Sequence, residues 1–566
     1  MELDKTRFEI LNSTGHLVIK GGPGCGKTTI ALLKAQSTIA NLASEQRVLF
    51  LSFSRAAVRQ ISDRMPDSLP LADRSRIEIR TFHAFFANVM RSHSRILNRL
   101  PATLIPPDQE RMLQAAHSRA AWSDEVSRLA KEEGRYVFDL LAPSMATLME
   151  QHPAVRKLYS DLYPLVLVDE FQDTNEDQWR VVRAFSRAST VICLADPDQR
   201  IFSHIPGVAD DRTPKAIQIL KATTFDLGRD NFRSPGAGLL DYANAVLTKV
   251  SHSIPESVRV FHYSYPTTCE WKTHQVLIAM KGYLRTSLGR EPTIAVLSPS
   301  NRVIGKVSQQ LLEPPNESES FPSVDHNLQW DPQATAAAGY VVASILDWPA
   351  LGRTAALEGT LNSLADFYRV RLTSSAQRAR TTIAMLTRAS DALRAGRPFK
   401  SKTPKRLDEL FQSGLNIVGR PPRDWQLVRS LLTGSAELEE VAKSARQLRL
   451  FRATDALSRG LLEVWNGEQS YVGAVGAVRQ VLSLESLEAA EPDPFPVSLM
   501  SMHRSKGKEF DGVLIVEEKY QGQLLKDDAN AEDDAARRRL LRVAITRARE
   551  LVAFVRPAGA LELTPR

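Results

Sequence analysis

A glycine-rich run near the start of the chain, GGPGCGKT from Gly21 to Thr28, has the residue types that hold phosphate groups. Glycines let backbone N–H groups close around phosphate oxygens, and the lysine of such a run reaches the β and γ phosphates of a nucleotide. The run follows an apolar, strand-like segment and opens a helix-like one, a context that disfavours the alternative of an unliganded glycine turn. We therefore predict a nucleotide site built from Gly22, Gly24, Cys25, Gly26, Lys27, Thr28 and Thr29.

Two adjacent carboxylates, Asp169 and Glu170, follow a second apolar run, Leu165 to Val168. Ligands of parallel α/β sheets bind at the carboxyl ends of the strands, so we expect both side chains to face the phosphates. Thr28 and Asp169 offer oxygen ligands for Mg²⁺, and Glu170 can orient or deprotonate a water molecule. Acidic residues are also common in the first turn of helices, so this pair alone does not identify a nucleotide site. The phosphate loop earlier in the chain favours the nucleotide interpretation. Together the two motifs predict hydrolysis of a Mg²⁺-bound nucleoside triphosphate.

Short β-branched and aliphatic runs alternate with helical stretches along the chain, which predicts an α/β fold with parallel sheets. The predicted strands are 17–20, 48–53, 77–80, 165–168 and 191–195 in a first unit and 293–297, 497–502, 513–518 and 551–555 in a second. Two long segments, from about 90 to 160 and from about 348 to 490, lack such runs. Each is predicted to be a helical insertion.

The composition, 566 residues of which 43% are hydrophobic and 24% charged, is that of an ordinary globular protein and excludes disordered, collagen and coiled-coil classes. Three scattered cysteines do not support a disulfide framework and favour a reducing, cytoplasmic location. The N-terminus lacks the pattern of a signal peptide. The uncharged run 332–346 is too short for a membrane span, so we expect a buried helix there and no membrane partner. The stretch 313–320 is expected to be a loop or linker.

The second predicted insertion carries most of the positive charge of the chain. From Leu361 to Gly460 there are 19 Lys and Arg against 9 Asp and Glu, a balance of +10, whereas the whole chain has a net charge of +8. A surface for nucleic-acid phosphates is one interpretation, and solvated helix faces are the other.

Seven further runs, in order along nearly the whole chain, resemble the motifs of superfamily 1 DNA helicases of the UvrD/Rep type. They are Leu51–Ala57, Thr81–Phe85, Asp169–Thr174, Asp196–Phe202, Asn231–Ser234, His503–Phe510 and Val543–Ala548.

The resemblance implies two RecA-like P-loop domains, 1A and 2A, with embedded helical insertions 1B and 2B. On this basis we expect 1A at 1–90 and 161–280, 1B at 91–160, 2A at 281–347 and 491–566, and 2B at 348–490.

The resemblance also implies roles for residues that spacing alone does not interpret. Gln199 is similar to a glutamine that senses the γ-phosphate, and Arg233 and Arg547 are similar to arginines that stabilise transition-state charge. An arginine fork suits phosphate oxygens, and its charge suits phosphoryl transfer. Phe232 takes the place of an aromatic residue that stacks on adenine, and Glu509 resembles a residue that contacts the ribose. Without the motifs, core packing would be the alternative for the phenylalanine.

A track for single-stranded nucleic acid needs aromatic side chains for bases and polar groups for phosphates. The candidates within the motifs are Phe53, Arg55, His83, Phe85, Phe202 and His503. Core packing is the competing interpretation for the phenylalanines beside predicted strands.

Several positions depart from the family pattern. No glutamine precedes Gln36, so Thr6 or Arg7 occupies the region of the adenine-reading glutamine. Phe202 and His204 stand where a base-stacking tryptophan is usual. Near the last motif, Ala536 and Arg537 stand in place of acidic residues, and Arg542 stands in place of a tyrosine before Val543. We expect weak discrimination between ATP and GTP, and weakened unwinding with intact hydrolysis.

The function implied is an ATP-dependent translocase on single-stranded DNA that unwinds duplex junctions, and the family resemblance implies the 3′-to-5′ direction. The alternative is a nucleotide-gated DNA-binding or sensing subunit within an anti-phage assembly resembling the Gabija system, whose helicase-like subunit partners a nuclease. A small-molecule kinase is disfavoured because one acceptor pocket does not explain seven ordered motifs.

Overall fold

The computed structural model describes residues 4–565 with short gaps. The gaps are 106–108, 111–112, 115–116, 202–206, 209–210, 229, 313, 315–320, 330–331, 371–375, 446–454, 468–469, 489–494 and 528. The predictions for Phe202, His204 and most of the linker 313–320 therefore lie outside the described residues.

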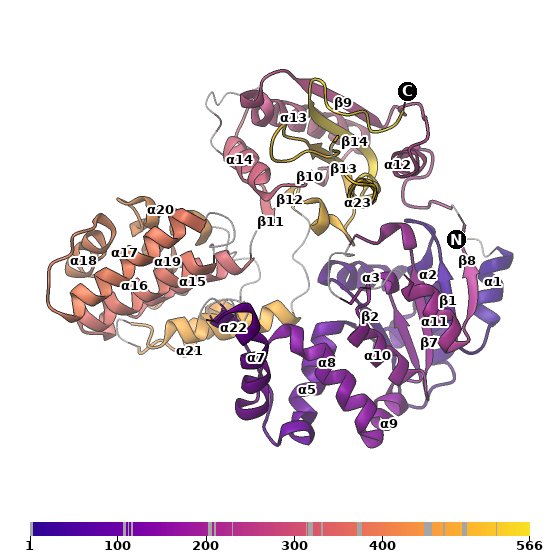
Figure 1. Ribbon diagram of the computed structural model, residues 1–566, viewed down its shortest axis with the longest axis horizontal. Coiled ribbons are helices and arrows are strands. Elements are labelled where there is room, and N and C mark those ends of the chain that lie inside the picture. Colours follow the sequence, from indigo (N-terminus) through magenta and orange to yellow (C-terminus); the bar gives the residue numbers. More distant parts are fainter. Residues whose placement is uncertain are drawn as a thin grey trace. The chain divides into compact units, whose positions relative to one another are not determined.

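The first sheet contains six parallel strands in the order β3-β2-β6-β7-β1-β8. Figure 1 labels β1, β2, β7 and β8 of this sheet. Its strands are β1 (Leu17–Lys20), β2 (Val48–Ser52), β3 (Ile77–Thr81), β6 (Leu165–Val168), β7 (Thr190–Ala195) and β8 (Thr223–Asp226). The central strand β6 is buried along its whole length, as is typical of a parallel sheet covered on both faces. Helix α1 (Lys5–Asn12) precedes these strands, and the helices between them include α2 (Lys27–Ile39), α3 (Arg55–Ser68), α4 (Leu71–Arg74), α5 (Phe82–Asn98), α8 (Phe138–Gln151), α9 (Pro153–Leu162), α10 (Glu176–Phe185) and α11 (Arg212–Leu220).

The second sheet is also parallel, in the order β11-β12-β10-β13-β14-β9. Its strands are β9 (Val258–Tyr263), β10 (Ile294–Ser298), β11 (Asn327–Gln329), β12 (Val497–Ser501), β13 (Phe510–Val516) and β14 (Ala548–Pro557). Apolar clusters form on both faces of this sheet. The associated helices are α12 (Leu239–Thr248), α13 (Cys269–Leu288), α14 (Asn301–Leu312) and α23 (Ala531–Ile545). The prediction of an α/β fold with parallel sheets is confirmed.

Strand β9 corrects one predicted boundary. We expected residues 161–280 to belong with the first sheet, but β9 pairs in parallel with β14 in the second sheet, from Val258 opposite Val552 onward. The second sheet therefore begins before residue 281.

By internal contacts, both sheets belong to one unit of the chain, 1–86, 142–330 and 493–566, and residues 87–141 and 331–492 form another. The first segment of this helical unit contains most of α5, α7 (Arg119–Glu133) and the short strands β4 (Thr103–Leu104) and β5 (Arg135–Tyr136). Helices α8 and α9, which we expected in the first insertion, lie mostly or wholly in the unit of the sheets.

The second segment of the helical unit is a bundle with its own apolar core, which includes Leu357, Phe367, Leu407 and Trp425. Its helices are α15 (Pro332–Leu346), α16 (Arg353–Val370), α17 (Ala376–Arg394), α18 (Lys402–Ser413), α19 (Pro421–Leu431), α20 (Ala436–Ala445), α21 (Asp455–Glu463) and α22 (Ala474–Glu488). Helix α15 coincides with the predicted buried helix. None of the helices in the described part of the chain has the length and hydrophobicity needed to span a membrane.

Candidate nucleotide-hydrolysis site

The phosphate loop connects β1 to α2 at the carboxyl end of the first sheet. Gly24 and Gly26 have φ angles of 79° and 89°, a left-handed conformation that glycine adopts without a Cβ penalty. A Cβ atom at Gly24 would lie 2.6 Å from Asn231 Oδ1, so a larger residue does not fit there. The Phe232 N–H donates to the Gly24 carbonyl at 2.9 Å. Glycine at this position therefore serves both the loop and its contact with the Asn231–Ser234 motif.

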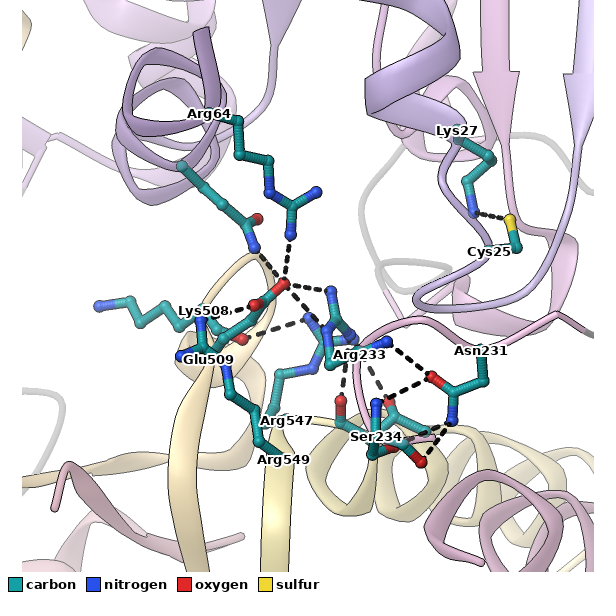
Figure 2. Close-up of polar contacts among 12 residues, drawn as sticks. Cys25, Lys27, Arg64, Asn231, Arg233, Ser234, Lys508, Glu509, Arg547 and Arg549 are labelled. Carbon is teal, nitrogen blue, oxygen red and sulfur yellow. Dashed lines mark hydrogen bonds and ion pairs between the residues drawn. The ribbon is translucent and has the colours of Figure 1, made fainter. Parts of the chain in front are cut away.

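Lys27, the first residue of α2, directs its ammonium group back into the loop. Its Nζ donates to the carbonyl oxygens of Gly21 and Gly22 at 2.6 and 2.8 Å. It also lies 3.8 Å from Cys25 Sγ, a contact drawn in Figure 2. The positive charge thus lies where backbone N–H groups and the N-terminus of α2 already favour an anion.

Asp169 and Glu170 follow β6. Glu170 adopts a φ of 49°, an uncommon left-handed conformation for a residue with a side chain and one that clusters at functional sites. Its carboxylate accepts a hydrogen bond from Gln172 Nε2 at 2.5 Å, and Gln172 Oε1 accepts one from the Asp196 N–H at 3.0 Å. Gln172 therefore fixes the orientation of the predicted base against the end of β7.

The two carboxylates have opposite pKa shifts. Burial and the neighbouring Glu170 charge raise the pKa of Asp169 to about 7, against the effect of Lys27. Burial acts on Glu170 in the same direction, but the charges of Lys506, Lys27 and Arg547 hold its pKa below the usual value. The environment therefore favours an ionised Glu170, as a general base requires.

One cavity of about 550 Å³ brings most of the predicted site residues together. The predicted site residues that line this cavity are Gly24, Cys25, Gly26, Lys27, Thr28, Thr29, Asp169, Glu170, Gln199, Phe232, Arg233, Glu509 and Arg547. Gly22 is not among the lining residues, and its carbonyl oxygen accepts a hydrogen bond from Lys27 Nζ. Both sheets contribute to the lining, because Glu509 and Arg547 adjoin β13 and β14.

The donor set in this cavity fits Mg²⁺. Thr28 and Asp169 both line the cavity and offer the hydroxyl and carboxylate oxygens that this ion accepts. Burial and the Glu170 charge both raise the pKa of Asp169, and a bound divalent cation would oppose both effects by favouring the ionised carboxylate.

Gln199 and Arg547 meet across the two sheets. Gln199 lies in η2 (Pro197–Gln199), directly after β7, and its Nε2 donates to Asp196 Oδ2 at 2.7 Å. Its Oε1 accepts from Arg547 Nη2 at 3.1 Å. Arg547 follows α23 and also donates from Nε to the Val543 carbonyl at 3.0 Å. The predicted γ-phosphate sensor and one predicted transition-state arginine are thus direct neighbours.

Glu509 is the centre of a second contact between the sheets (Figure 2). Its carboxylate accepts from Arg233 Nε and Nη2 at 2.9 and 2.6 Å, from Arg64 Nη2 at 2.8 Å and from Arg549 Nη2 at 3.0 Å. Burial would raise the pKa of this carboxyl, but the charges of Arg233, Arg64 and Arg549 hold it far below its usual range. Arg233 also donates from Nη1 to the Thr546 carbonyl at 3.1 Å, so it contacts the second sheet's side of the cavity at two points.

Phe232 lines the cavity with a ring that is 56% exposed, so it is not a core phenylalanine. The guanidinium of Arg7 lies 5.3 Å from the centre of this ring. Arg7 is buried and donates from Nη2 to the Cys25 carbonyl at 2.9 Å. Helix α1 thereby supports both the phosphate loop and the aromatic ring.

Lys506 is a functional candidate that the sequence prediction did not single out, although it lies within the motif His503–Phe510. The residue is buried, and its Nζ contacts the Asp173 carboxylate, the Gln199 carbonyl at 2.6 Å and Glu170 at 3.5 Å. Burial lowers the pKa of this ammonium, but the Glu170 and Asp173 charges outweigh it and raise the pKa overall. A buried lysine between two carboxylates from another sheet is visible only in three dimensions.

The predicted nucleic-acid track is not uniform. Phe85 is 2% exposed and packs against Phe86, Tyr159, Tyr163 and Phe185. It belongs to the apolar core, so the prediction that it stacks on bases is wrong.

The other described track candidates lie near the ends of the motif-bearing strands. Phe53 is half-buried with its ring 5.3 Å from Phe82, and Arg55 is exposed at the start of α3. His83 in α5 and His503 in η5 (Met502–Ser505) are half-buried. Their nucleic-acid role stays a prediction.

Two family models match the chain. A model described as an AAA domain matches residues 8–204, and one described as a UvrD-like helicase C-terminal domain matches residues 496–555. The first contains the phosphate loop, Asp169, Glu170 and Gln199, and the second contains Glu509 and Arg547.

The chain is also similar to several curated proteins. It is 23% identical over 239 residues to the putative ATP-dependent DNA helicase YjcD of Bacillus subtilis, covering 34% of this chain and 32% of the relative. It is 22% identical over 285 residues to the ATP-dependent DNA helicase Rep of Escherichia coli, covering 42% of each chain. A shorter match, 40% identical over 112 residues, links it to the RecBCD enzyme subunit RecB of Mycobacterium tuberculosis, covering 19% of this chain and 10% of the relative. The matches thus cover well under half the length of these relatives.

Proposed function

Because the chain belongs to the UvrD-like superfamily 1 helicases, we propose that it is an ATP-dependent DNA helicase that moves along single-stranded DNA. The observation that carries the proposal is the joint lining of one cavity by Lys27, Glu170 and Gln199 from the first sheet and by Glu509 and Arg547 beside the second. Nucleotide bound in such a cavity contacts both sheets, so its binding and hydrolysis would move the sheets relative to each other. A motor protein uses such a movement to step along its track.

In the proposed reaction the residues of this chain have separate tasks. Lys27 and the backbone N–H groups of the phosphate loop bind the β and γ phosphates. Glu170 Oε accepts the proton of the attacking water. Gln199 senses the γ-phosphate. Arg233 and Arg547 stabilise the charge that develops on the transferred phosphoryl group. When bound by Thr28 and Asp169, Mg²⁺ would neutralise phosphate charge.

The DNA side of the proposal rests on the family pattern. Phe53, Arg55, His83 and His503 would supply base stacking and phosphate contacts, and the direction is 3′ to 5′. The two segments of the helical unit, 87–141 and 331–492, would correspond to the family insertions 1B and 2B. The basic 361–460 region would contact the duplex ahead of the junction.

The direct test is ATP hydrolysis by the purified full chain with Mg²⁺, with and without single-stranded DNA. The expected result is DNA-stimulated hydrolysis, together with displacement of a strand from a duplex that has a 3′ tail and not from one that has a 5′ tail. An ATPase rate that does not respond to single-stranded DNA would contradict the proposal.

A second candidate is a nucleotide-gated sensing subunit that acts with a nuclease partner in anti-phage defence. The atypical residues at two motifs favour it, because they depart from the helicase pattern: Phe202 and His204 at the first, and Ala536, Arg537 and Arg542 beside the last. Strand displacement by the isolated chain would argue against this candidate. Co-elution with a nuclease encoded by a neighbouring gene, without unwinding by the chain alone, would support it.

A further inference from the structure

Arg542, in the last turn of α23, and Arg547, just after the helix, both reach toward the first sheet, and only Arg547 has a role in the proposed reaction. Arg547 contacts Gln199, as described above. Arg542, five residues earlier, stands where the family resemblance leads us to expect a tyrosine. It is 3% exposed, so burial of its charge must be compensated by its surroundings.

Within the described residues, a hydrogen bond from Nε holds the Arg542 side chain against the second sheet. Its Nε donates to Asn244 Oδ1 in α12 at 2.8 Å, and α12 packs on α23. This bond directs both Nη atoms across to the first sheet. There Nη1 lies 3.6 Å from Asp196 Oδ2, and Nη2 lies 3.9 Å from Asp198 Oδ2.

These separations are those of an ion pair without a hydrogen bond. Within the described part of the chain, Nη1 is buried and has no hydrogen-bond partner. A buried donor in this state costs free energy that a small approach toward an acceptor would recover. Asp196 Oδ2 is the acceptor within reach.

Asp196 Oδ2 already has a donor, Gln199 Nε2, at 2.7 Å. One carboxylate oxygen therefore lies between two donors, one from its own sheet and one from the opposite sheet. Bringing Arg542 Nη1 to a hydrogen-bond distance of about 2.9 Å requires an approach of about 0.7 Å. Movements of this size accompany closure of two packed domains around a ligand.

We propose that Arg542 is a positioning residue that couples approach of the two sheets to the orientation of Gln199. On closure Arg542 bonds to Asp196, which weakens the hold of Asp196 on the Gln199 amide. The amide N–H group then turns toward the γ-phosphate side of the cavity, while Arg547 keeps its contact with Oε1. Arg542 itself does not touch the nucleotide. This inference rests on the proposed ATP hydrolysis.

The test compares Arg542→Ala and Arg542→Gln with Arg537→Ala, measuring DNA-stimulated ATPase of the full chain. Arg537 lies on the same helix and donates to the Gln523 carbonyl at 3.1 Å, so it controls for lost charge on α23. We expect kcat to fall roughly tenfold in both Arg542 variants, with the KM for ATP within about threefold of wild type and Arg537→Ala unchanged. Arg542→Gln retains an N–H group for Asn244, which guards against misfolding.

The decisive measurement is made in a Gln199→Ala background. If Arg542 acts through Gln199, adding Arg542→Ala there should lower kcat less than about twofold, because residues that act as a unit are not additive. Multiplicative losses, a change in KM alone, or normal kcat in the single variants would overturn the inference. A wild-type protein without ATPase activity would overturn the proposed function and this inference with it, whereas an active wild type with equally active Arg542 variants would overturn the inference alone.

Discussion

The guanidinium of Arg7 lies 5.3 Å from the centre of the Phe232 ring. Phe232 lines the nucleotide cavity. Arg7 Nη2 is bonded to the Cys25 carbonyl and to Asp230 at 2.9 and 3.0 Å, and Arg7 Nη1 is bonded to Asp4. Both Nη atoms of this arginine are therefore occupied by protein acceptors. Thr6 or Arg7 stands in the region of the adenine-reading glutamine, and of these Arg7 packs on the aromatic ring with both Nη atoms bonded to protein.

The first prediction concerns base selectivity. Stacking on Phe232 is available to any purine, so kcat/KM for ATP and GTP should differ by less than about tenfold. Phe232→Ala should raise KM for both nucleotides to a similar extent. A wild-type preference for ATP of about 100-fold or more would show that other residues read the base.

The second prediction separates binding from turnover. Lys27→Ala should weaken nucleotide binding as well as hydrolysis, because it removes the cation within the phosphate loop. Glu170→Gln should keep binding near normal and lower kcat by about 100-fold or more, because it removes the base and leaves an amide of the same shape. Fluorescent-nucleotide titration and steady-state ATPase measure the two effects. Near-normal turnover in Glu170→Gln would eliminate this residue as the base.

The third prediction concerns pH and stability. The folded-state pKa of Glu509 lies below its unfolded value, so its ion pairs stabilise the protein above an unfolded pKa of about 4.3, and this stabilisation is lost as pH falls below it. Glu509→Gln should lower the free energy of unfolding by about 2 kcal/mol at neutral pH, as for hydrogen bonds to a charged group.

Urea unfolding without nucleotide, at neutral pH and at about pH 3.5, measures this difference. The gap between wild type and Glu509→Gln should shrink at the acidic pH. Glu532→Gln, at an exposed acid in the first turn of α23, is the control and should have little effect at either pH. A gap that stays constant would assign the effect to packing instead of charge.

The fourth prediction tests the basic helical segment. Arg420 and Arg423 are exposed at the start of α19. Reversing both charges should weaken binding to a tailed duplex and flatten the dependence of log affinity on log salt, because fewer counterions are released. Single-strand-stimulated ATPase should stay near normal.

The control for this experiment reverses two lysines that are exposed in the unit of the sheets, Lys157 and Lys215. It changes the net charge by the same amount and should leave the salt dependence unchanged. An unaltered slope in the Arg420 and Arg423 variant would mean that these arginines serve structure or solubility.

Sequence patterns predicted the strands at the centres of the sheets because those strands are covered on both faces. Leu165–Val168 and Ile294–Leu297 are uninterrupted apolar runs for this reason. The edge strand β8 was missed because its residues, TTFD, are mostly exposed and polar. The edge strand β9, VRVFHY, was missed because it is only partly buried and includes a charged residue, so it lacks the apolar run of a central strand.

The same contrast holds for the site. Lys27, Glu170 and Gln199 were predictable because each lies in a short run whose chemistry is local. Lys506 and Arg542 were not, because their importance comes from partners on the other sheet. Phe85 shows the opposite error, since a motif position indicated a nucleic-acid contact while the fold places the ring in the core.

The two sheets differ in how they can form during synthesis. All six strands of the first sheet precede Leu227, so it can assemble as soon as that part of the chain has left the ribosome. The second sheet is divided, because β9, β10 and β11 precede the helical segment 331–492 and β12, β13 and β14 follow it. Strand β10, apolar and buried in the finished protein, pairs with β12 and β13. At roughly 5–20 residues per second, it waits on the order of ten seconds or more for either partner. Nascent chains should therefore be most prone to aggregation, and most dependent on chaperones, while this segment is being translated.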